Sequence, residues 1–393
     1  MVETLKGIVC AVGIGGMVGG AYAASPRLWP IEVDGKHGAI DRRGKLVVEP
    51  QYDSAIEFAG GMARVSQNGK TGFIDATGRL AISPKKSLSR GSGDFAAEIS
   101  IAALISPEFS EGLAVFRLDD REGYVDVNGD IVIAAQFDQA FPFYDGLAVV
   151  RVGSKFGWID RSGEVVIAAT YDKVQPFTDG LACVLVYDKG GYGYIDRKGQ
   201  WAIAAQFNYA YPFVEARARA QVKGGYAYID TTGKTVVPPS SDYKLSTDFS
   251  NGRAAFRLDA GWGYLDPSGA VAIAPIFFGG YAFREGMARA TLTGGMSPEG
   301  KRTQKLFGYV GLDGKFVVKP QFDDAGDFNE GRAGVSVDGK YGFIDAQGKL
   351  RIEPRYAGVE NFSDGLARVW IQTAGRGKHA YVDPDGHEVW TSP

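Results

Sequence analysis

The eight residues from Phe156 to Gly163, F-G-W-I-D-R-S-G, decide the fold, because versions of this stretch recur along almost the whole chain. Asp160 serves as the anchor of the phrase. Its equivalents are Asp41, Asp75, Asp126, Asp196, Asp230, Asp266, Gly311 (in a degenerate copy that begins at Tyr309), Asp345 and Asp383. The nine steps between these ten anchors are 34, 51, 34, 36, 34, 36, 45, 34 and 38 residues. Periods of about 20 to 50 residues are typical of solenoids, propellers and arrays, in which each unit buries its apolar faces against its neighbours.

A second phrase, F-Y-D-G-L-A at residues 143–148, accompanies the first. It recurs nine times and never precedes the first anchor, its copies beginning at Phe58, Phe109, Phe143, Phe177, Phe213, Phe249, Phe283, Phe328 and Phe362. Alternating and β-branched residues predict four short strands per unit, at about 139–143, 147–152, 156–159 and 165–167. The spacing of Asp160 and Gly163 is the type I turn preference, which predicts a hairpin corner.

The aromatic residues of the phrase indicate how neighbouring units pack. Since side chains alternate along a strand, Phe156 and Trp158 share one face while Gly157 and Ile159 share the other. We interpret Trp158 as core between units and expect Gly157 to leave room for an aromatic ring of the adjacent unit. A carbohydrate-stacking surface is the alternative role of the aromatic stripe.

The repeats resemble the WG (KWG) repeat family of bacterial proteins. That family's phrase has Gly-Lys, aromatic, Gly, aromatic, Ile, Asp, two free positions and Gly, followed by Phe, two positions, Gly, Leu and Ala. The copies that match best are Lys155–Gly163, Gly191–Gly199 and Lys340–Gly348. The resemblance implies an all-β, non-catalytic repeat module, often exported, with mostly unknown ligands and no catalytic residues to transfer.

The fold class predicted is therefore an all-β array of about ten antiparallel β-meander repeats, each with three to four strands. Whether the array closes is open at this stage. Ten units exceed the usual count of about four to eight propeller blades. The first unit also begins at its second strand, near residues 29–33, and the last ends after its fourth, at Val389 and Trp390. A propeller-like ring and an open superhelical array both fit.

The first residues have the pattern of a secretory signal. Lys6 precedes an uncharged run, and Ala21-Tyr22-Ala23 supplies small residues before a cleavage point at Ala24. We expect a cleaved signal peptide at 1–23, with an uncleaved anchor as the alternative, and a repeat domain at 24–393 with insertions at 83–107 and 293–305. The expected location is periplasmic or secreted, and no later segment is long and apolar enough to span a membrane.

Composition excludes some functions. The chain has 393 residues, 55 of them glycine, and a formal net charge of −3, which argues against nucleic acid as the main partner. Of two cysteines, Cys10 lies in the expected signal, so Cys183 cannot form an internal disulfide in the mature chain. Sister repeats place Val or Ala at its position, which favours a small buried side chain over a reactive thiol.

We find no sequence pattern for catalysis. There is no G-x-S-x-G, H-E-x-x-H, Walker loop or paired C-x-x-C, so we expect no cofactor, no catalytic residue and no metal site. One metal hypothesis depends on ring closure, since His37 and His379 both stand four residues before their anchors in the first and last units.

Arginine supplies the candidate binding residues. On the second predicted strand, one face carries Leu147, Val149 and Arg151, and the equivalent positions of the repeats collect ten arginines: Arg64, Arg117, Arg151, Arg217, Arg219, Arg253, Arg257, Arg289, Arg332 and Arg368. Guanidinium groups suit carboxylates and phosphates. As a candidate binding stripe, these residues suit an acidic protein surface or an anionic cell-envelope glycan, although internal pairing is the favoured interpretation. The expected internal partners are corner acids such as Asp145 and Asp179.

The favoured hypothesis is an exported, non-catalytic repeat protein that acts as a binding or scaffold module for a protein or a cell-envelope glycan. Two others remain: a glycan-active enzyme whose carboxylates meet only on folding, and a purely structural spacer.

Overall fold

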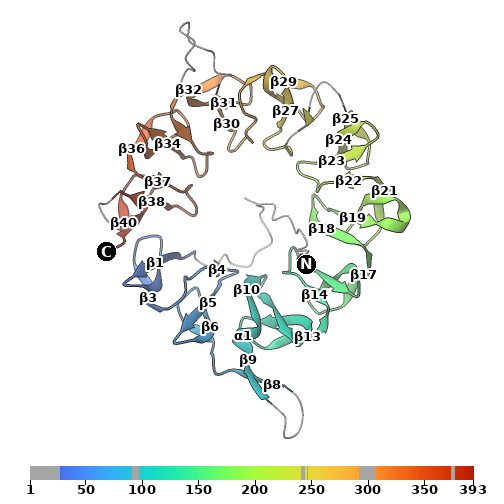
Figure 1. The fold of residues 1–393 in the computed structure, drawn as a ribbon, viewed down its shortest axis with the longest axis vertical. Helices are drawn as coiled ribbons and strands as arrows, with labels where there is room; N and C mark the ends of the chain where they lie inside the picture. The colour runs from blue at the N-terminus through green and yellow to red at the C-terminus, as the bar shows by residue number, and fades with distance from the viewer. Residues whose placement is uncertain (1–26, 91–96, 240–243, 246, 292–305, 373–376) are drawn as a thin grey trace, which may run out of the picture.

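The structure, a computed structural model, describes residues 27–90, 97–239, 244–245, 247–291, 306–372 and 377–393. Ten small antiparallel sheets stand side by side in a ring, with the first sheet next to the last (Figure 1). The molecule is a ten-bladed β-propeller. The predicted all-β repeat fold is confirmed, and of the two arrangements left open the chain adopts the closed ring.

Most blades are four-stranded meanders whose strands follow one another in sequence order. The first five blades comprise β1 (Trp29–Val33), β2 (Lys36–Ile40), β3 (Leu46–Tyr52); β4 (Phe58–Ala59), β5 (Met62–Gln67), β6 (Lys70–Asp75), β7 (Leu80–Ile82); β10 (Ile105–Ser110), β11 (Leu113–Leu118), β12 (Arg121–Asp126), β13 (Ile131–Phe137); β14 (Gln139–Ala140), β15 (Leu147–Val152), β16 (Lys155–Asp160), β17 (Val165–Tyr171); and β18 (Lys173–Thr178), β19 (Leu181–Val186), β20 (Gly191–Ile195), β21 (Trp201–Phe207).

Blades six to ten repeat the pattern. They comprise β22 (Tyr209–Ala210), β23 (Arg217–Val222), β24 (Gly225–Asp230), β25 (Thr235–Val237); β26 (Lys244–Leu245), β27 (Ala254–Leu258), β28 (Gly261–Leu265), β29 (Val271–Phe277); β30 (Met287–Ala290), β31 (Phe307–Gly311), β32 (Phe316–Phe322); β33 (Asp324–Ala325), β34 (Ala333–Val337), β35 (Lys340–Ile344), β36 (Leu350–Tyr356); and β37 (Gly358–Val359), β38 (Ala367–Ile371), β39 (Lys378–Val382), β40 (Glu388–Thr391).

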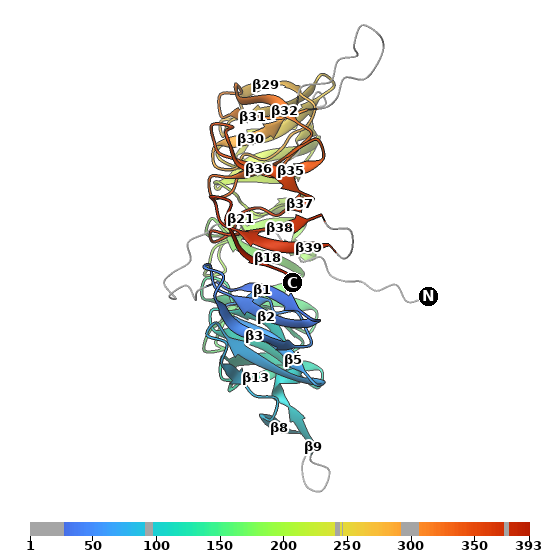
Figure 2. The ribbon, with the colours of Figure 1, turned by 90° about the vertical axis from the view of Figure 1, so that its left-hand side faces the viewer.

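The first strand of each complete blade lines the central opening and the fourth lies at the rim (Figure 1). Seen edge-on, the ring is a disc one blade thick (Figure 2). Because the strands are antiparallel, the connections from first to second and from third to fourth strands share one face of this disc, which we call the corner face. The connections from second to third strands, and from each blade to the next, share the other, which we call the loop face.

Each anchor aspartate forms the predicted hairpin corner. In the fourth blade Gly163 N donates to Asp160 O at 3.0 Å, and the Asp160 carboxylate accepts from the main-chain N of Ser162 and Glu164 at 2.9 and 3.0 Å. Gly163 has φ of +88°, and a Cβ there would lie 3.2 Å from Ile133 of the preceding blade. Glycine is thus required both by the turn and by the contact between blades.

Trp158 confirms the interpretation of the aromatic stripe as inter-blade core. Its side chain is 2% exposed and packs on Tyr171 and Phe177, at ring distances of 5.9 and 5.4 Å. Phe177 belongs to the next blade. Ile159, on the opposite face of β16, packs in the cluster shared with the preceding blade. Every blade therefore buries both faces, and the core is divided among the blade interfaces.

The expected role of Gly157 is wrong in its partner. A Cβ at Gly157 would lie 2.5 Å from the carbonyl oxygen of Ile167 and 2.7 Å from Ala169 N, both in β17 of the same blade. The register between β16 and β17 shifts at this point, so the bulged backbone of the outer strand fills the space. The space left by the missing side chain of Gly157 therefore accommodates that backbone rather than an aromatic ring from the adjacent unit.

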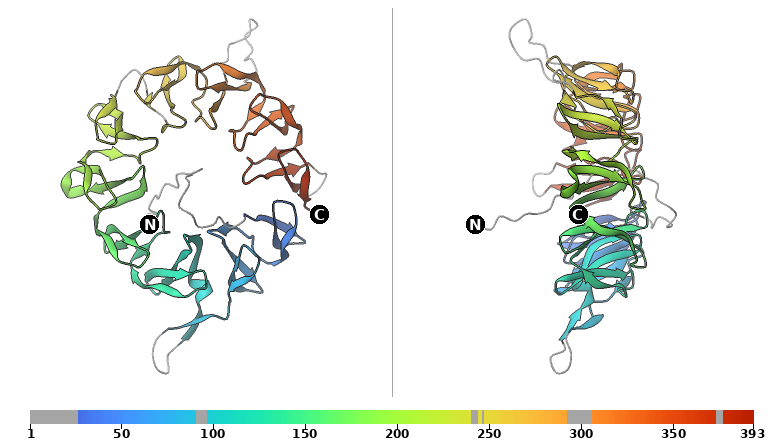
Figure 3. Two further views of the ribbon diagram at one scale, coloured as in Figure 1. Left: turned by 180° about the vertical axis from the view of Figure 1, so that it is seen from behind. Right: turned by 90° about the vertical axis from the view of Figure 1, so that its right-hand side faces the viewer.

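The ring closes at a seam between the first and tenth blades (Figure 3). Trp29, Ile31 and Ile40 pack on Leu366 and Tyr381 in one buried cluster. The Tyr381 hydroxyl donates to Pro30 O at 2.8 Å. The same tyrosine position bonds the next blade elsewhere in the ring, at 2.7–2.8 Å from Tyr124, Tyr194, Tyr264 and Tyr309. Those acceptors lie outside the strands of the next blade, whereas Pro30 lies in β1, so the same tyrosine bridges the seam to a strand rather than to a loop.

The first insertion forms a two-stranded ribbon, β8 (Ser87–Arg90) with β9 (Ala97–Ser100), that extends from the ring, followed by the four-residue helix α1 (Ile101–Leu104) (Figure 1). The second insertion, 293–305, and the expected signal peptide lie outside the described residues. No helix in the described part of the chain is long and apolar enough to cross a membrane.

Candidate functional site

The ten candidate arginines do not form one stripe. They occupy three register positions on the second strand of the blades. These positions are two residues apart on one face of the strand, and each has different surroundings. Arg217, Arg253 and Arg332 stand at the first position; Arg64, Arg219, Arg289 and Arg368 at the second; Arg117, Arg151 and Arg257 at the third.

The first group, which we call the bridging arginines, joins neighbouring blades on the corner face. Arg253 donates from Nε and Nη2 to the Leu312 carbonyl at 3.1 and 2.8 Å, and Arg217 donates to Pro267 O at 2.9 Å. Arg332 contacts Pro384 O at 3.3 Å in the same way. Each acceptor is the residue after the anchor of the next blade. These guanidinium groups therefore hold the ring together.

Arginines at the second position also point at the next blade, toward its inner strand. Arg219 Nε lies 2.9 Å from the carboxylate of Asp248, and its guanidinium lies 4.2 Å from the Tyr211 ring centre. Arg289 Nε lies 3.3 Å from an Asp327 carboxylate oxygen, and its Nη1 donates to Ala325 O at 2.7 Å.

Two members of this second group differ from the pair just described. Arg368 has no carboxylate partner among the described residues, and its buried Nε, like that of Arg289, has no hydrogen-bond partner there. Arg64 is exposed.

The third group lies at the loop face, where each side chain contacts its own blade. Arg117 reaches Asp120 and Glu122 at 3.9 and 3.7 Å, and Arg151 donates to Gly153 O at 3.0 Å. Arg257 lies 6.0 Å from the Trp262 ring centre. Arg117 and Arg257 are exposed, as is Arg64 of the second group, and Arg151 is partly exposed.

Internal pairing is therefore the main use of the arginines, but not with the expected partners. Asp145 is paired with Arg197, at 2.6 Å, and Asp179 accepts from Ala216 N at 2.7 Å. Main-chain carbonyls supply most acceptors of the bridging arginines, because the corners of adjacent blades bring their carbonyls, rather than carboxylates, within reach.

A relay of corner side chains runs along the corner face and was not foreseen. The Glu285 carboxylate accepts from Glu330 N and Gly331 N, and the Glu330 carboxylate accepts in turn from Asp364 N and Gly365 N, all at 2.6–2.9 Å. At the seam Asp364 meets the Arg27 guanidinium at 2.6 Å. The same link is made upstream by Glu111, Asp179, Glu215 and Asn251.

These corner residues have positive φ, near +50°, which is uncommon for glutamate. Since the side chain of each satisfies main-chain donors of the next corner, the contact between blades explains why a residue other than glycine is kept there. Their recurrence before the glycine of the second phrase was the sequence pattern that could have revealed the relay.

On the loop face, a hollow of about 420 Å³ lies between the fifth and sixth blades. Tyr192 and Tyr209 line it with ring centres 5.1 Å apart, and Tyr187, 65% exposed, stands at its edge beside Lys173. Burial raises the pKa of Tyr192 to about 12, so its hydroxyl stays protonated and can donate. The hollow combines aromatic faces with a cation and amide groups, which suits a sugar or a peptide.

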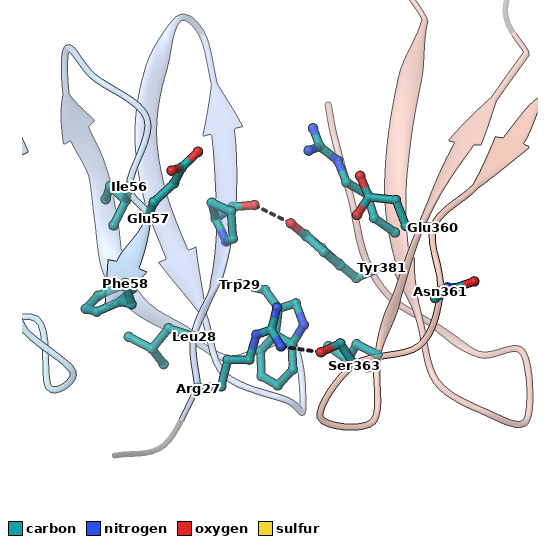
Figure 4. A pocket seen from close by; sticks show the side chains of 13 residues that line it. Arg27, Leu28, Trp29, Ile56, Glu57, Phe58, Glu360, Asn361, Ser363 and Tyr381 are labelled. Carbon is teal, nitrogen blue, oxygen red and sulfur yellow. Dashed lines mark hydrogen bonds between the residues drawn. The ribbon is translucent and has the colours of Figure 1, made fainter. Parts of the chain in front are cut away.

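A second cavity, of about 240 Å³, lies at the seam (Figure 4). The first, second and tenth blades all contribute to it, through Arg27, Leu28, Trp29, Pro30, Ile56, Glu57, Phe58, Glu360, Asn361, Ser363, Leu366, Arg368 and Tyr381. Figure 4 shows Tyr381 crossing from the tenth blade toward the first, with Glu57 and Glu360 on opposite sides.

The metal hypothesis gains no support from the seam. His379 packs its ring 5.2 Å from that of Trp390, and burial lowers its pKa, with the Arg368 charge acting in the same direction. Within the described part of the chain, the cluster of potential metal ligands is Asp383, Asp385 and His387, and it is an anchor corner of the repeat.

Cys183 is a small buried side chain, as expected. It is 1% exposed, its Sγ lies 3.5 Å from Ala210 O of the next blade, and burial raises the pKa of its thiol.

Comparison with known families gives one match. The model of the WG containing repeat matches eight times, at residues 38–70, 123–156, 156–189, 192–226, 226–260, 262–294, 307–341 and 341–369. No curated protein sequence matches the chain.

Among solved structures the likenesses are to diverse proteins at low identity. A eukaryotic initiation factor aligns with a TM-score of 0.47 and 9% identity over 84% of this chain and 96% of its own. The dihydro-heme d1 dehydrogenase NirN aligns at 0.33 and 13% over 97% and 76%, and AztD from Citrobacter koseri at 0.31 and 12% over 93% of each chain. These values carry no conclusion about function.

Proposed function

Since the chain belongs to the family of WG containing repeats, we propose that it is an exported protein that binds a protein or an anionic cell-envelope glycan through its loop face and catalyses no reaction. The signal peptide at 1–23 is removed after Ala23, and the ring acts in the periplasm or outside the cell as a rigid binding platform.

The single observation that carries this proposal is the contrast between the two faces of the disc. On the corner face, the arginine and carboxylate side chains that recur are engaged with the neighbouring blade, as in the bridging of Arg253 to Leu312 and of Glu285 to Glu330. On the loop face, the connections differ in length and sequence from blade to blade. The β8–β9 ribbon leaves the ring at this face. The described strands on either side of residues 240–243, 292–305 and 373–376 also end at this face.

The tyrosine-lined hollow gives this face a concrete ligand site. Tyr187 offers an exposed ring, while Lys173 is exposed beside it and supplies a positive charge. Insertions on a regular scaffold commonly carry recognition, because the scaffold fixes their position and tolerates their variation.

Site-specific photo-crosslinking tests the proposal. A diazirine amino acid at Tyr187 on the loop face is compared with the same group at Lys198, an exposed corner-face residue. In cells that express the full chain, we expect adducts with envelope protein or glycan from position 187 and none from position 198. Adducts from position 198 alone, or from neither position, would contradict the proposal.

Two further measurements separate its parts. N-terminal sequencing of the exported protein is expected to start at Ala24. Charge reversal at Lys173, compared with the same change at Lys198, is expected to weaken capture of an anionic ligand at least tenfold.

A further inference from the structure

The first blade differs from the others in its inner strand. Its described strands are three, and β1 pairs with β2 in the register of a second strand, since Trp29 opposes Ile40 as Ala148 opposes Ile159. The other three-stranded blade, which starts at β30, does have an inner segment, because Phe278 N donates to Thr291 O there. The seam cavity occupies the place beside β1 where an inner strand of the first blade would run (Figure 4).

The hydrogen-bonding pattern of the other blades shows what this place would accept. In those blades the segment that runs along the inner side of the second strand, the inner segment, donates a main-chain N–H to the second-strand carbonyl at the register position of Arg151. Asp138 N donates to Arg151 O at 3.0 Å, and Asp323 N donates to Ser336 O at 2.9 Å. The equivalent acceptor in the first blade is the carbonyl of Glu32. Among the described residues no inner strand supplies its donor. Since an inner ladder is only two residue pairs long in the fourth, sixth, ninth and tenth blades, a short extended segment suffices.

Trp29 fills the apolar part of this place. Other blades have alanine at its position, such as Ala148 and Ala254. In those blades the phenylalanine that begins the second phrase, which we call the corner phenylalanine, packs on the tyrosine of the preceding blade. Phe249, for example, lies 5.0 Å from Tyr228 between ring centres. At the seam Trp29 is 6% exposed in the cluster that contains Tyr381. The part of the place that stays open is therefore polar.

Arg368 defines that polar part. Its register equivalents Arg219 and Arg289 face Asp248 and Asp327, which stand in the next blade, each directly before the corner phenylalanine. Arg368 lines the seam cavity beside the first blade. Its buried Nε, like that of Arg289, has no hydrogen-bond acceptor among the described residues, but Arg289 has the Asp327 carboxylate 3.3 Å away and Arg368 has no carboxylate partner there. A buried guanidinium N–H without an acceptor costs free energy, which an incoming carboxylate would recover.

Among the described residues, the other charged side chains that line the cavity form no ion pair with Arg368. Arg27 is neutralised by Asp364 at 2.6 Å. Glu57 and Glu360 are exposed. In the chain's own sequence, the position equivalent to Asp248 and Asp327 is Ala23, which has no carboxylate.

We propose that the seam of the mature protein binds an extended acidic segment of a partner protein, which adds to β1 as the inner strand of the first blade and places a carboxylate on Arg368. We refer to this place as the inner-strand slot. The partner's main-chain N–H donates to Glu32 O, and its acidic residue takes the part that Asp327 plays toward Arg289. The proposal rests on the signal cleavage proposed above, because removal of residues 1–23 takes away the residues that align with the inner segments of the other blades, such as Ala23 with Asp327.

The probe is a fluorescent peptide with the sequence of residues 322–328, F-D-D-A-G-D-F, which contains the natural partner of Arg289. Its anisotropy is followed as the chain beginning at Ala24 is added. We expect saturable binding that weakens at least tenfold when Asp327 of the peptide is replaced by Asn. A peptide with Asp323→Pro, which lacks the ladder N–H, is expected not to bind.

On the protein, Arg368→Gln is expected to weaken binding at least tenfold and to abolish the preference for the acidic peptide. Arg64→Gln, at the same register position but exposed on the second blade, is the matched control and leaves binding unchanged. Binding that ignores the Asp-to-Asn change in the peptide, or no binding to the chain beginning at Ala24, would overturn the proposal. The peptide arm remains decisive even if Arg368→Gln perturbs folding.

The uncleaved chain of 393 residues separates the slot from the proposed export. Weaker binding of the peptide to this chain than to the chain beginning at Ala24 supports the slot, because the preceding residues then compete for it. An exported protein found uncleaved would contradict the proposed processing and leave the peptide result as it stands.

Discussion

Replacing Trp158 by alanine is expected to cost about 4 kcal/mol of unfolding free energy. The side chain is 2% exposed and lies between the fourth and fifth blades, against Tyr171 and Phe177. A buried aromatic side chain removes about 150 to 250 Å² from water, and at about 25 cal/mol per Å² this amounts to about 4 to 6 kcal/mol. Measured truncations of buried tryptophan and phenylalanine cost about 3 to 5 kcal/mol.

Urea unfolding followed by far-ultraviolet circular dichroism measures this effect, since the readout does not depend on the deleted indole. The change in midpoint, at unchanged slope, gives the loss of free energy. Tyr187→Ala is the control, because that aromatic side chain is 65% exposed and its removal is expected to cost less than about 0.5 kcal/mol. Equal midpoints for the two variants would refute the inter-blade core and favour the stacking surface.

Three further predictions concern the ring and its titration. Arg253→Gln is expected to lower the unfolding free energy by about 1.5 to 3 kcal/mol through lost bonds to Leu312 O, whereas exposed Arg117→Gln changes it by less than about 0.5 kcal/mol in the same urea assay. In three corners, the hydroxyl group two residues after the anchor aspartate donates a hydrogen bond to the anchor carboxylate. This bond holds the pKa of Asp160, Asp230 and Asp266 below the ordinary value. Their stabilisation is therefore present above the unfolded pKa of about 3.9 and is lost as pH falls through the lower folded value. Urea midpoints between pH 6 and pH 2 are expected to fall less steeply for Asp160→Asn, and an unchanged slope would count against this role. In the chain from Ala24, Cys183 is expected to resist maleimide at pH 8 until urea unfolds the ring, because its thiol is buried with a raised pKa; rapid labelling of the native protein would contradict this.

The sequence was sufficient for what depends on one repeat. The corner at Asp160 and Gly163 follows from local turn chemistry, and the burial of Trp158 follows from alternation along a strand that recurs ten times. Both properties are fixed within a few residues, and each copy supports the others.

What depends on how blades meet was not predictable. The backbone of Ile167 beside Gly157 arises from a register shift within the sheet, and the carbonyl of Leu312 reaches Arg253 only once two blades are placed side by side. The spacing of residues in the repeat shows which face of a strand a side chain occupies. It does not show which atom of the neighbouring blade that side chain contacts. The candidate arginines were therefore placed on the right face and assigned the wrong partners.

Closure was left open because it depends on the small rotation between blades, accumulated around the ring. No residue of a single repeat fixes that rotation. The contact of Tyr381 with Pro30, by which the tyrosine of the tenth blade bonds β1 across the seam, becomes visible only in the folded chain. That Arg368 has no carboxylate partner among the described residues is likewise apparent only by comparison with Arg219 and Arg289 in their folded surroundings.

Lysine cross-linking across the seam tests the closed ring most directly. Lys36 begins β2, Lys340 begins β35 and Lys378 begins β39, and all three stand five residues before the anchor of their blade. The pair Lys340–Lys378 therefore serves as an internal ruler for the pair Lys378–Lys36 in monomeric protein. The closed ring predicts that both links form with a short amine cross-linker in similar yield. Formation of the Lys340–Lys378 link without the Lys378–Lys36 link would show an open array and contradict the account.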